Sequence, residues 1–544
     1  MSFMSFDPLA QYYPSARFPI YASSGMVCAS SPQAAAAGLE ALKKGGNAMD
    51  AAVATASALT VVEPTANGLG SDAFALIWSE KDQKLYGLNS SGPSPREISA
   101  EKVLADYPDC GGHMPRNGWA PVNVPGAVMA WREISRRFGR LSLRDTLDPA
   151  IRYARDGYPL GPNLADMWNH SLVSYRKNLR GPEFDAWFET FDPGEDRLYQ
   201  AGDVVRLPHH ADTLEEIGES CGESFYFGAL ARKIDDASRA QGGYLRYEDL
   251  AAYRADWVEP ISVRYRGYDV CEIPPNGQGI VALMALNILG NFEFSTREDP
   301  VCVHRQIEAL KMAFQDAFRA VTDPKDMDVD PSVLLGADYG ISRAREMTMR
   351  AQVYGSILPP KSGTVYLCCA DGEGNMVSYI QSNYMGFGSG IVIPGTGIAL
   401  QNRGADFSLN PQDANYLRPS KRSYHTIIPG FLMKDGLPVG PFGVMGGYMQ
   451  PQGHVQVAMN LIDFHLDPQQ ALDAPRFQWM RDNTVTVETR FSPSIASALR
   501  RMGHDLRVDL SAASFGRGQM ILRMPSGVLV GGTESRTDSN IACF

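Results

Sequence analysis

Residues 364–382 have the pattern of a β-hairpin, and no other segment constrains the fold of this chain as strongly. The stretches TVYLCCA and MVSYIQS flank the turn-forming residues DGEGN at 371–375. If Ala370 pairs with Met376, the same register places Thr364 opposite Ser382, and a β-bulge would shift the pairing by one residue. The hairpin is therefore expected to bring two hydroxyl groups together at its open end.

The segment that precedes the hairpin has a different character. Residues 349–363, MRAQVYGSILPPKSG, lose the helical periodicity of the preceding sequence and contain two prolines, which predicts an exposed connection.

A threonine is a weak nucleophile unless a base removes its proton, and a chain-terminal threonine carries such a base as its own α-amine, with a pKa of ~7.7–8.0. A cut before Thr364 would create a nucleophile together with its base, and the Ser382 hydroxyl would orient it.

Helical and β patterns follow one another along the chain. Near the start, two Ala-rich helical stretches are separated by a Gly-Gly-Asn break at 45–47 and are expected to pack closely. Strands are predicted from Phe74 to Trp78 and up to about Leu88. The pattern is mainly helical from about Val128 to Phe318 and mainly β after residue 363. The chain is therefore expected to mix helices and strands in one body.

Composition and charge narrow the classes of partner. The chain has 44% hydrophobic and 20% charged residues, and its net charge of −11 argues against a nucleic-acid or anionic-membrane partner. No apolar run reaches the roughly 18 residues of a membrane span, and the first residues lack the pattern of a secretory signal. The eight cysteines are scattered without a CxxC pair, as expected of reduced thiols in a cytoplasmic protein. A small-molecule ligand is expected.

Signatures of bound cofactors are absent from the sequence. The segment GFGSG at 386–390 lacks the last glycine of a dinucleotide fingerprint and the Lys-Ser/Thr of a phosphate-binding loop. Apart from the adjacent His209 and His210, the histidines are dispersed, and no HExxH motif occurs. We expect neither a cofactor nor a metal site.

The sequence resembles the γ-glutamyltransferase family over nearly its whole length. The most specific match is TVYLCCADGEGNMVSYIQSNYMGFGSGIVIPGTGIALQNRGADFSLNP, which aligns without a gap to the nucleophile region of the family. Further matches are GGNAMDAAVA, EPTANGLGSDAF, NVPGAVMAW, PAIRYARDG, EPISVRYRGYDV and APRF. The resemblance implies an α+β fold, a four-layer αββα sandwich of the N-terminal nucleophile hydrolases. It also implies cleavage between Gly363 and Thr364 into a large subunit, residues 1–363, and a small one, residues 364–544.

The resemblance assigns roles position by position. Thr364 takes the place of the nucleophile and Ser382 that of the hydroxyl residue beside it. Asp406 matches the acid that holds the substrate α-amino group in glutamyl-processing members, and Gly446 and Gly447 match the pair whose N–H groups form the oxyanion hole. Loss of one such donor typically costs ~2.7–4 kcal/mol of transition-state stabilisation.

Other positions depart from the glutamyl-specific pattern. Asn89 stands where those members have an arginine for the substrate α-carboxylate, and an amide does not replace a bidentate guanidinium. His425 and Thr426 replace paired serines, and Tyr384 replaces a substrate-facing asparagine. Arg403 is a cation where those members have an amide, so it can supply the missing carboxylate contact, and Arg403 and His425 together are candidates to bind a carboxylate beside the nucleophile.

These departures leave the substrate open. The expected activity is that of an autoprocessed amidohydrolase or acyltransferase that cleaves a small amide through an acyl-threonine intermediate. Within the family, an oxamate-type amidohydrolase and a cephalosporin acylase are the alternatives to a glutathione-processing enzyme. An uncleaved, inactive binding or scaffold relative is the alternative of another class, because Ser362 and Gly363 differ from the acidic residue that often precedes the nucleophile. The oligomeric state, including a higher homo-oligomer, is left open.

Overall fold

Two seven-stranded sheets lie face to face in the computed structural model, which describes residues 17–194, 197–354 and 363–544. The first sheet has the order β1 (Ile20–Ala22), β20 (Leu529–Thr533), β19 (Arg517–Arg523), β15 (Leu437–Met445), β14 (Gly430–Lys434), β9 (Tyr268–Glu272) and β8 (Ile261–Tyr265). The second has the order β21 (Asn540–Cys543), β2 (Gly25–Ala29), β10 (Gly363–Asp371), β11 (Met376–Tyr384), β3 (Asp72–Ser79), β4 (Lys84–Ser90) and β7 (Asp256–Val258).

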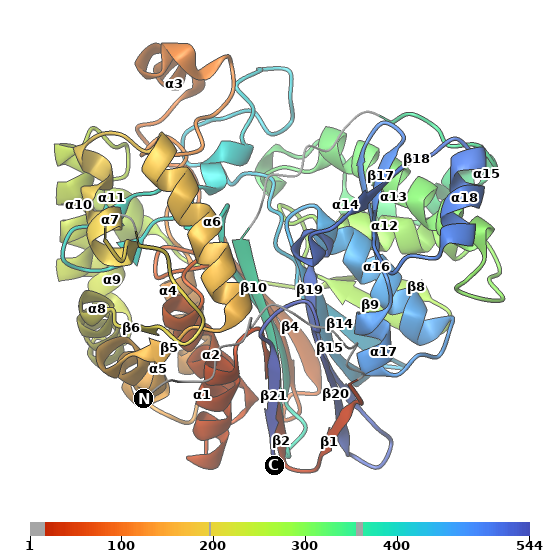
Figure 1. Ribbon diagram of the computed structural model, residues 1–544, viewed down its shortest axis with the longest axis horizontal. Helices are drawn as coiled ribbons and strands as arrows, with labels where there is room; N and C mark the ends of the chain where they lie inside the picture. The colour runs from red at the N-terminus through yellow and green to blue at the C-terminus, as the bar shows by residue number, and fades with distance from the viewer. Residues whose placement is uncertain (1–16, 195–196, 355–362) are drawn as a thin grey trace, which may run out of the picture.

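Helices cover the outer face of each sheet (Figure 1). The second sheet is covered by α1 (Pro32–Lys43), α2 (Ala48–Val62), α4 (Ala127–Phe138), α5 (Leu143–Asp156), α6 (Pro162–Asn178), α7 (Asp185–Phe191), α8 (Pro208–Glu219), α9 (Glu223–Phe227), α10 (Ala229–Ala240) and α11 (Tyr247–Ala252). The first is covered by α12 (Gly279–Leu289), α13 (Pro300–Ala320), α14 (Pro331–Leu335), α16 (Met449–Ile462), α17 (Pro468–Asp473) and α18 (Pro493–Arg501). The expected four-layer αββα sandwich is confirmed.

The remaining elements lie at the periphery or in short ribbons. They are α3 (Ala100–Asp106), α15 (Ala337–Glu346), β5 (Tyr158–Pro159), β6 (Val204–Val205), β12 (Val392–Ile393), β13 (Ile398–Ala399), β16 (Phe477–Arg481), β17 (Thr484–Glu488) and β18 (Asp505–Asp509). In the described part of the chain, no helix combines the length and apolarity needed to cross a membrane.

Both sides of residue 363 contribute strands to both sheets. The first sheet takes β1, β8 and β9 from the earlier residues, and the second takes β2, β3, β4 and β7. A cut before Thr364 would therefore leave two chains that share one core. Of the connection predicted at 349–363, residues 355–362 lie outside the described residues.

The alternation of side chains along β10 explains its unbroken apolar run. Val365, Leu367 and Cys369 face the helices around α2, whereas Tyr366 and Cys368 face the space between the sheets. Every residue of this strand is buried because the sheet is covered on both faces. Cys368 and Cys369 therefore point to opposite faces of the sheet.

The predicted elements agree with the structure except in one region. The break at 45–47 separates α1 from α2, and the side chain of Asn47 accepts hydrogen bonds from the N–H groups of Met49 and Asp50 at the start of α2. Strands β3 and β4 occur at the predicted positions. The stretch from Val128 to Phe318 is helical apart from β5–β9, where EPISVRYRGYDV supplies the hairpin β8–β9.

The close packing of α1 against α2 depends on Gly38. A Cβ atom at this position would lie 2.3 Å from Thr55 Oγ1 and 2.9 Å from Val27 Cγ1. The Thr55 hydroxyl donates to the Ala51 carbonyl at 2.7 Å, which fixes it in place. The two helices therefore leave no room for a methyl group here.

We expect Gly38→Ala to lower the free energy of unfolding by about 1–3 kcal/mol, although alanine is the better helix former, because the added methyl overpacks the helix contact. Thermal unfolding followed by circular dichroism measures the effect. Ala36→Ser adds one atom to the exposed face of the same helix and should change stability by less than about 0.5 kcal/mol. An unchanged or more stable Gly38→Ala protein would contradict the close contact.

Candidate active site

The hairpin β10–β11 has the predicted register. Ala370 pairs with Met376, the pairing continues to Val365 with Gln381, and a bulge then shifts it so that Gly363 pairs with Tyr384. Thr364 lies within this bulge, and its Oγ1 is 3.0 Å from Ser382 Oγ. The prediction that Thr364 and Ser382 meet at the open end of the hairpin is confirmed.

The Ser382 hydroxyl joins three groups at this point. It donates to the carbonyl oxygen of Gly363 at 2.8 Å and accepts from the N–H of Tyr384 at 2.8 Å. Since its single hydrogen is used on the Gly363 carbonyl, the 3.0 Å contact is one in which Thr364 donates to Ser382. Tyr384 reaches this position with a left-handed φ of 76°, uncommon for a non-glycine residue.

A third polar residue continues the row across the sheet. Strand β3 neighbours β11, and Asp72 is the direct partner of Ser382 in that pairing. Thr364, Ser382 and Asp72 thus lie side by side on three adjacent strands, all fully buried. Asp72 belongs to the segment EPTANGLGSDAF, but no role was predicted for it; an acid that opens the otherwise apolar stretch DAFALIW was the available signal.

Asp72 contacts two of the predicted site residues. Its Oδ2 lies 3.0 Å from His425 Nε2 and 3.8 Å from Arg403 Nε. Within the described residues, its Oδ1 receives a single long hydrogen bond of 3.4 Å, from the N–H of Gly92. Burial raises the pKa of Asp72 to about 7, while the positive charge of Arg403 acts in the opposite direction.

His425 is committed to this cluster by both ring nitrogens. Nε2 faces Asp72 Oδ2, and Nδ1 accepts from the N–H of Ile427 at 3.4 Å. Burial, followed by the charge of Arg403, holds the pKa of His425 well below its usual value. The ring is therefore neutral and acts as a support, with neither nitrogen left for a substrate.

Arg403 is buried but only partly bonded. Its Nη1 donates to Thr426 Oγ1 at 2.8 Å, and the guanidinium carbon lies 4.1 Å from the centre of the Tyr384 ring. Among the described residues, Nη2 has no hydrogen-bond partner, and Nε has only the 3.8 Å ion-pair contact with Asp72. A buried guanidinium with unused donors is costly in isolation and suits an anionic group.

Asp406 lies beside Arg403 and receives two phenol groups. The hydroxyls of Tyr384 and Tyr448 donate to its Oδ1 at 2.9 and 3.0 Å. Its Oδ2 has no hydrogen-bond partner among the described residues. Burial raises the pKa of this carboxyl group, and Arg403 with the two tyrosines offsets part of that rise. Tyr448 is a second site residue that the sequence did not predict.

Gly446 and Gly447 form the turn between β15 and α16. Their φ angles of 137° and 57° are left-handed, and a Cβ at Gly446 would lie 3.1 Å from Gly516 Cα. Neither N–H finds a hydrogen-bond partner in the described part of the chain. The side chain of Gln278 donates to the carbonyls of Gly447 and Thr426, at 2.9 and 2.6 Å, and so ties this turn to the segment that carries His425.

Asn89 lies on β4, and both polar atoms of its side chain are already hydrogen-bonded. Its Oδ1 accepts from both the N–H and the hydroxyl of Ser91, at 3.0 and 2.7 Å, and its Nδ2 donates to Asn276 Oδ1 at 2.9 Å. The amide thus stabilises the neighbouring loop and supplies no positive charge. Arg403 is the buried cation of the site.

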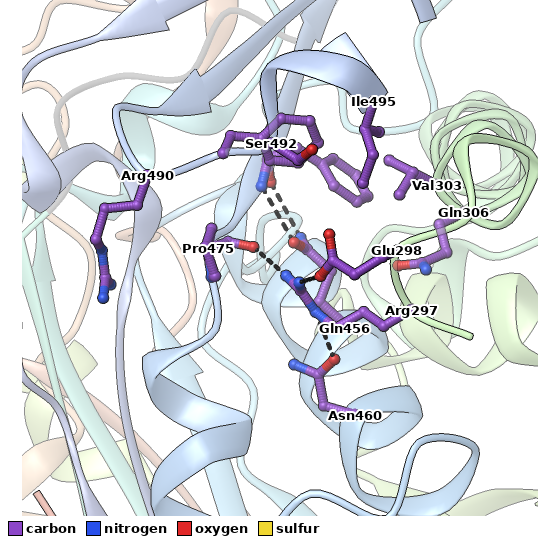
Figure 2. Close-up of a pocket in the computed structure, with 12 residues that line it drawn as sticks. Arg297, Glu298, Val303, Gln306, Gln456, Asn460, Pro475, Arg490, Ser492 and Ile495 are labelled. Atoms are coloured by element: carbon purple, nitrogen blue, oxygen red, sulfur yellow. Dashed lines mark hydrogen bonds and ion pairs between the residues drawn. The ribbon is translucent and has the colours of Figure 1, made fainter. Parts of the chain in front are cut away.

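Two other features lie outside this site. The pocket of Figure 2 is lined by residues of α13, α16 and α18 and their neighbours, and Arg297 inside it donates to Asn460 Oδ1 at 3.2 Å. His304, Glu308 and His504 also bring potential metal-ligating atoms within 4.8 Å of one another. There the Lys311 ammonium group donates to Glu308 at 2.8 Å and already supplies a positive charge.

Two facing sheets enclosed by helices, with a buried threonine and serine hydrogen-bonded at the end of one hairpin, are the architecture of the N-terminal nucleophile hydrolases. The family model described as gamma-glutamyltranspeptidase matches residues 34–544. The chain belongs to the gamma-glutamyltranspeptidase family, and it is therefore an enzyme of the hydrolase and transferase type that acts on amide bonds.

Relatives cover almost the whole chain. The glutathione hydrolase-like YwrD proenzyme of Bacillus subtilis is 35% identical, with 93% of this chain and 95% of the relative covered. The oxamate amidohydrolase proenzyme of Klebsiella pneumoniae is 34% identical, with 96% and 98% covered. A crystal structure of cephalosporin acylase from Bacillus halodurans is 54% identical, with a TM-score of 0.95 and 99% of each chain covered.

The two phenol groups on Asp406 should each stabilise the fold, because hydrogen bonds to an ionised group contribute about 1.5–3 kcal/mol. Tyr384→Phe keeps the ring under Arg403 and removes only the hydroxyl. We expect a loss of stability in that range in denaturant unfolding, a similar loss for Tyr448→Phe, and a larger-than-additive loss for the double variant. Tyr366→Phe, which removes a buried bond of 2.8 Å to the neutral Ser378 hydroxyl, serves as the matched control with a smaller effect. Negligible losses of stability in the two single variants, or a loss in the double variant equal to their sum, would contradict this geometry.

Proposed function

We propose that the chain cleaves itself between Gly363 and Thr364 and that Thr364 then acts as an N-terminal nucleophile on a small amide. The observation that carries this proposal is the hydrogen-bonded group of Thr364 Oγ1, Ser382 Oγ and the Gly363 carbonyl. The hydroxyl that meets Thr364 also polarises the carbonyl of the bond to be cut. The names of two relatives, which call them proenzymes, support the same view.

Maturation would proceed within this group. Thr364 Oγ1 attacks the carbonyl carbon of Gly363, the Ser382 hydroxyl stabilises the developing oxyanion, and the peptide nitrogen is released from carbon as the ester forms. Water then hydrolyses the ester, which leaves a carboxylate on Gly363 and a free α-amine on Thr364. The new amine titrates at ~7.7–8.0 and is therefore available as a base near neutral pH.

Turnover would use the same atoms on an external amide. Thr364 Oγ1 attacks the substrate carbonyl while its α-amine takes up the hydroxyl proton and delivers it to the departing amine or ammonia. The free N–H groups of Gly446 and Gly447 are suited to the oxyanion. Water, or an acceptor amine, then releases the acyl group. Hydrolysis and transfer differ only in this last step.

We infer further that the acyl group carries a carboxylate bound by Arg403. The unused Nη2 of a buried guanidinium favours an anionic partner, and Asn89 offers none of the charge that glutamyl-specific relatives have at that position. His425 plays no direct part in this contact, because both of its ring nitrogens are occupied. Relatives named oxamate amidohydrolase and cephalosporin acylase support an acyl group other than γ-glutamyl.

The nucleophile is tested on a denaturing gel and in an ammonia-release assay. The wild-type protein should give two bands, residues 1–363 and 364–544, whereas Thr364→Ala should stay undivided and lose at least about 10³-fold in activity. Ser382→Ala should slow the cut by about 10²-fold, because the scissile carbonyl loses its donor. Ser378→Ala removes a hydroxyl from the same strand and should cleave normally. An active wild-type protein with an intact chain would refute the proposal, and a single inactive band would indicate a binding relative.

The carboxylate contact is tested with matched amides. Oxamate should release ammonia while glutathione and γ-glutamyl anilides release none of their amines. Arg403→Gln should raise KM for oxamate by about 10- to 100-fold, the cost of one charged hydrogen bond, and leave KM for the neutral oxamide unchanged. Arg403→Lys, which keeps the charge without the planar fork, should fall between the two. Turnover of glutathione but not of oxamate would overturn this substrate class.

A further inference from the structure

Carboxyl groups predominate among the charged side chains that surround Arg403. Two carboxyl groups, the fully buried Asp72 and the half-buried Asp406, act on this one guanidinium, and His425 is neutral. A substrate carboxylate placed on Arg403 would be a third anion beside this one guanidinium, because Arg422 is engaged by Asp256 and the α-amine of matured Thr364 loses its charge at ~7.7–8.0. Three carboxylates around one guanidinium repel one another in a site from which water is largely removed, and this repulsion favours uptake of a proton by one of the carboxyl groups.

Asp72 is the carboxyl group placed to do so. Asp406 keeps two phenol donors on its Oδ1, which favour its ionised form. Asp72 has one neutral imidazole on Oδ2 and a single 3.4 Å contact on Oδ1, and it lies deeper, with no exposed surface. A carboxylate with so few donors in a buried strand is the easier of the two to protonate.

We propose that Asp72 is a positioning residue that couples binding of the substrate carboxylate to uptake of one proton, by releasing Arg403 from its ion pair when it becomes neutral. The proposal rests on the role of Arg403 given above. The proton comes from solvent and is returned when the acyl product leaves, so the overall reaction is unchanged. Specificity for an anionic acyl group then depends on pH.

The groups that face Asp72 determine the direction of the effect. Arg403, His425 and Arg422 approach it from the segments after β13, and Tyr226 and Tyr253 from the helical side of β3. Arg422 is engaged by Asp256 and by the Ser91 carbonyl, and so it does not replace Arg403. With the pKa of Asp72 raised to about 7, the proton is present below that pH and lost above it. Binding of an anion should therefore weaken as pH rises.

The experiment measures binding of oxalate, a non-hydrolysable dicarboxylate, to the matured enzyme by titration calorimetry from about pH 6 to about pH 8.5. The wild-type dissociation constant should rise by up to about tenfold per pH unit above pH 7. Asp72→Asn should bind at every pH about as tightly as the wild type does at low pH. The matched Asp406→Asn should retain the pH dependence, and Arg403→Gln should bind weakly throughout.

A second measurement needs no variant and remains informative if Asp72→Asn fails to fold. Titration of the wild-type enzyme in two buffers of different ionisation enthalpy should report uptake of about 0.5–1 proton per oxalate near pH 7.5. The terminal amine of Thr364 also titrates in this range, and the comparison with Asp72→Asn separates the two groups.

Failure of this inference can be distinguished from failure of the proposed function. Zero proton uptake, a pH dependence that survives Asp72→Asn, or one abolished by Asp406→Asn would each overturn the role of Asp72 while amide hydrolysis by Thr364 stands. Absence of oxalate binding would remove the carboxylate subsite and this inference with it. Absence of turnover with any amide would refute the proposed function, whereas oxalate binding does not require turnover.

Discussion

The hydrogen bond between Thr364 and Ser382 is the contact on which the site depends. The register of β10 and β11 places Thr364 opposite Ser382, and the bulge at the end of β10 changes the pairing so that Gly363 pairs with Tyr384. The Ser382 hydroxyl also donates to the Gly363 carbonyl. One hairpin thus places Thr364, Ser382 and the Gly363 carbonyl within one hydrogen-bonded group.

The rest of the fold keeps this group buried and aligned. The sheet that carries β10 is covered by helices on one face and by the first sheet on the other, so that the Thr364 and Ser382 side chains are fully buried. Strands from both sides of residue 363 interleave in both sheets. For this reason, a cut before Thr364 would free its amine without releasing either fragment from the core.

The sequence predicted what is local and missed what depends on strand order. The register of residues 364–382 follows from turn residues and side-chain alternation, so the meeting of Thr364 and Ser382 could be predicted from these residues alone. Asp72 could not be placed in the same row, because only the neighbouring of β3 and β11, strands that lie far apart along the chain, puts it beside Ser382. Tyr448 and the commitment of both His425 nitrogens likewise arise from contacts between distant loops.

This division between local and distant contacts also separates the proposed nucleophile from the residues proposed to meet its substrate. Thr364 and Ser382 belong to the two strands of one hairpin, whereas Asn89, Arg403 and His425 come from three separate segments that meet only in the folded chain. A substitution in one of those segments changes the charge near the acyl group without altering the 3.0 Å contact between Thr364 and Ser382. Because a buried charge must be compensated where it lies, Arg403 in this chain requires Asp72 close by. Under the proposed function, specificity would therefore depend on this pair of buried groups, whereas the attack would depend on the hairpin alone.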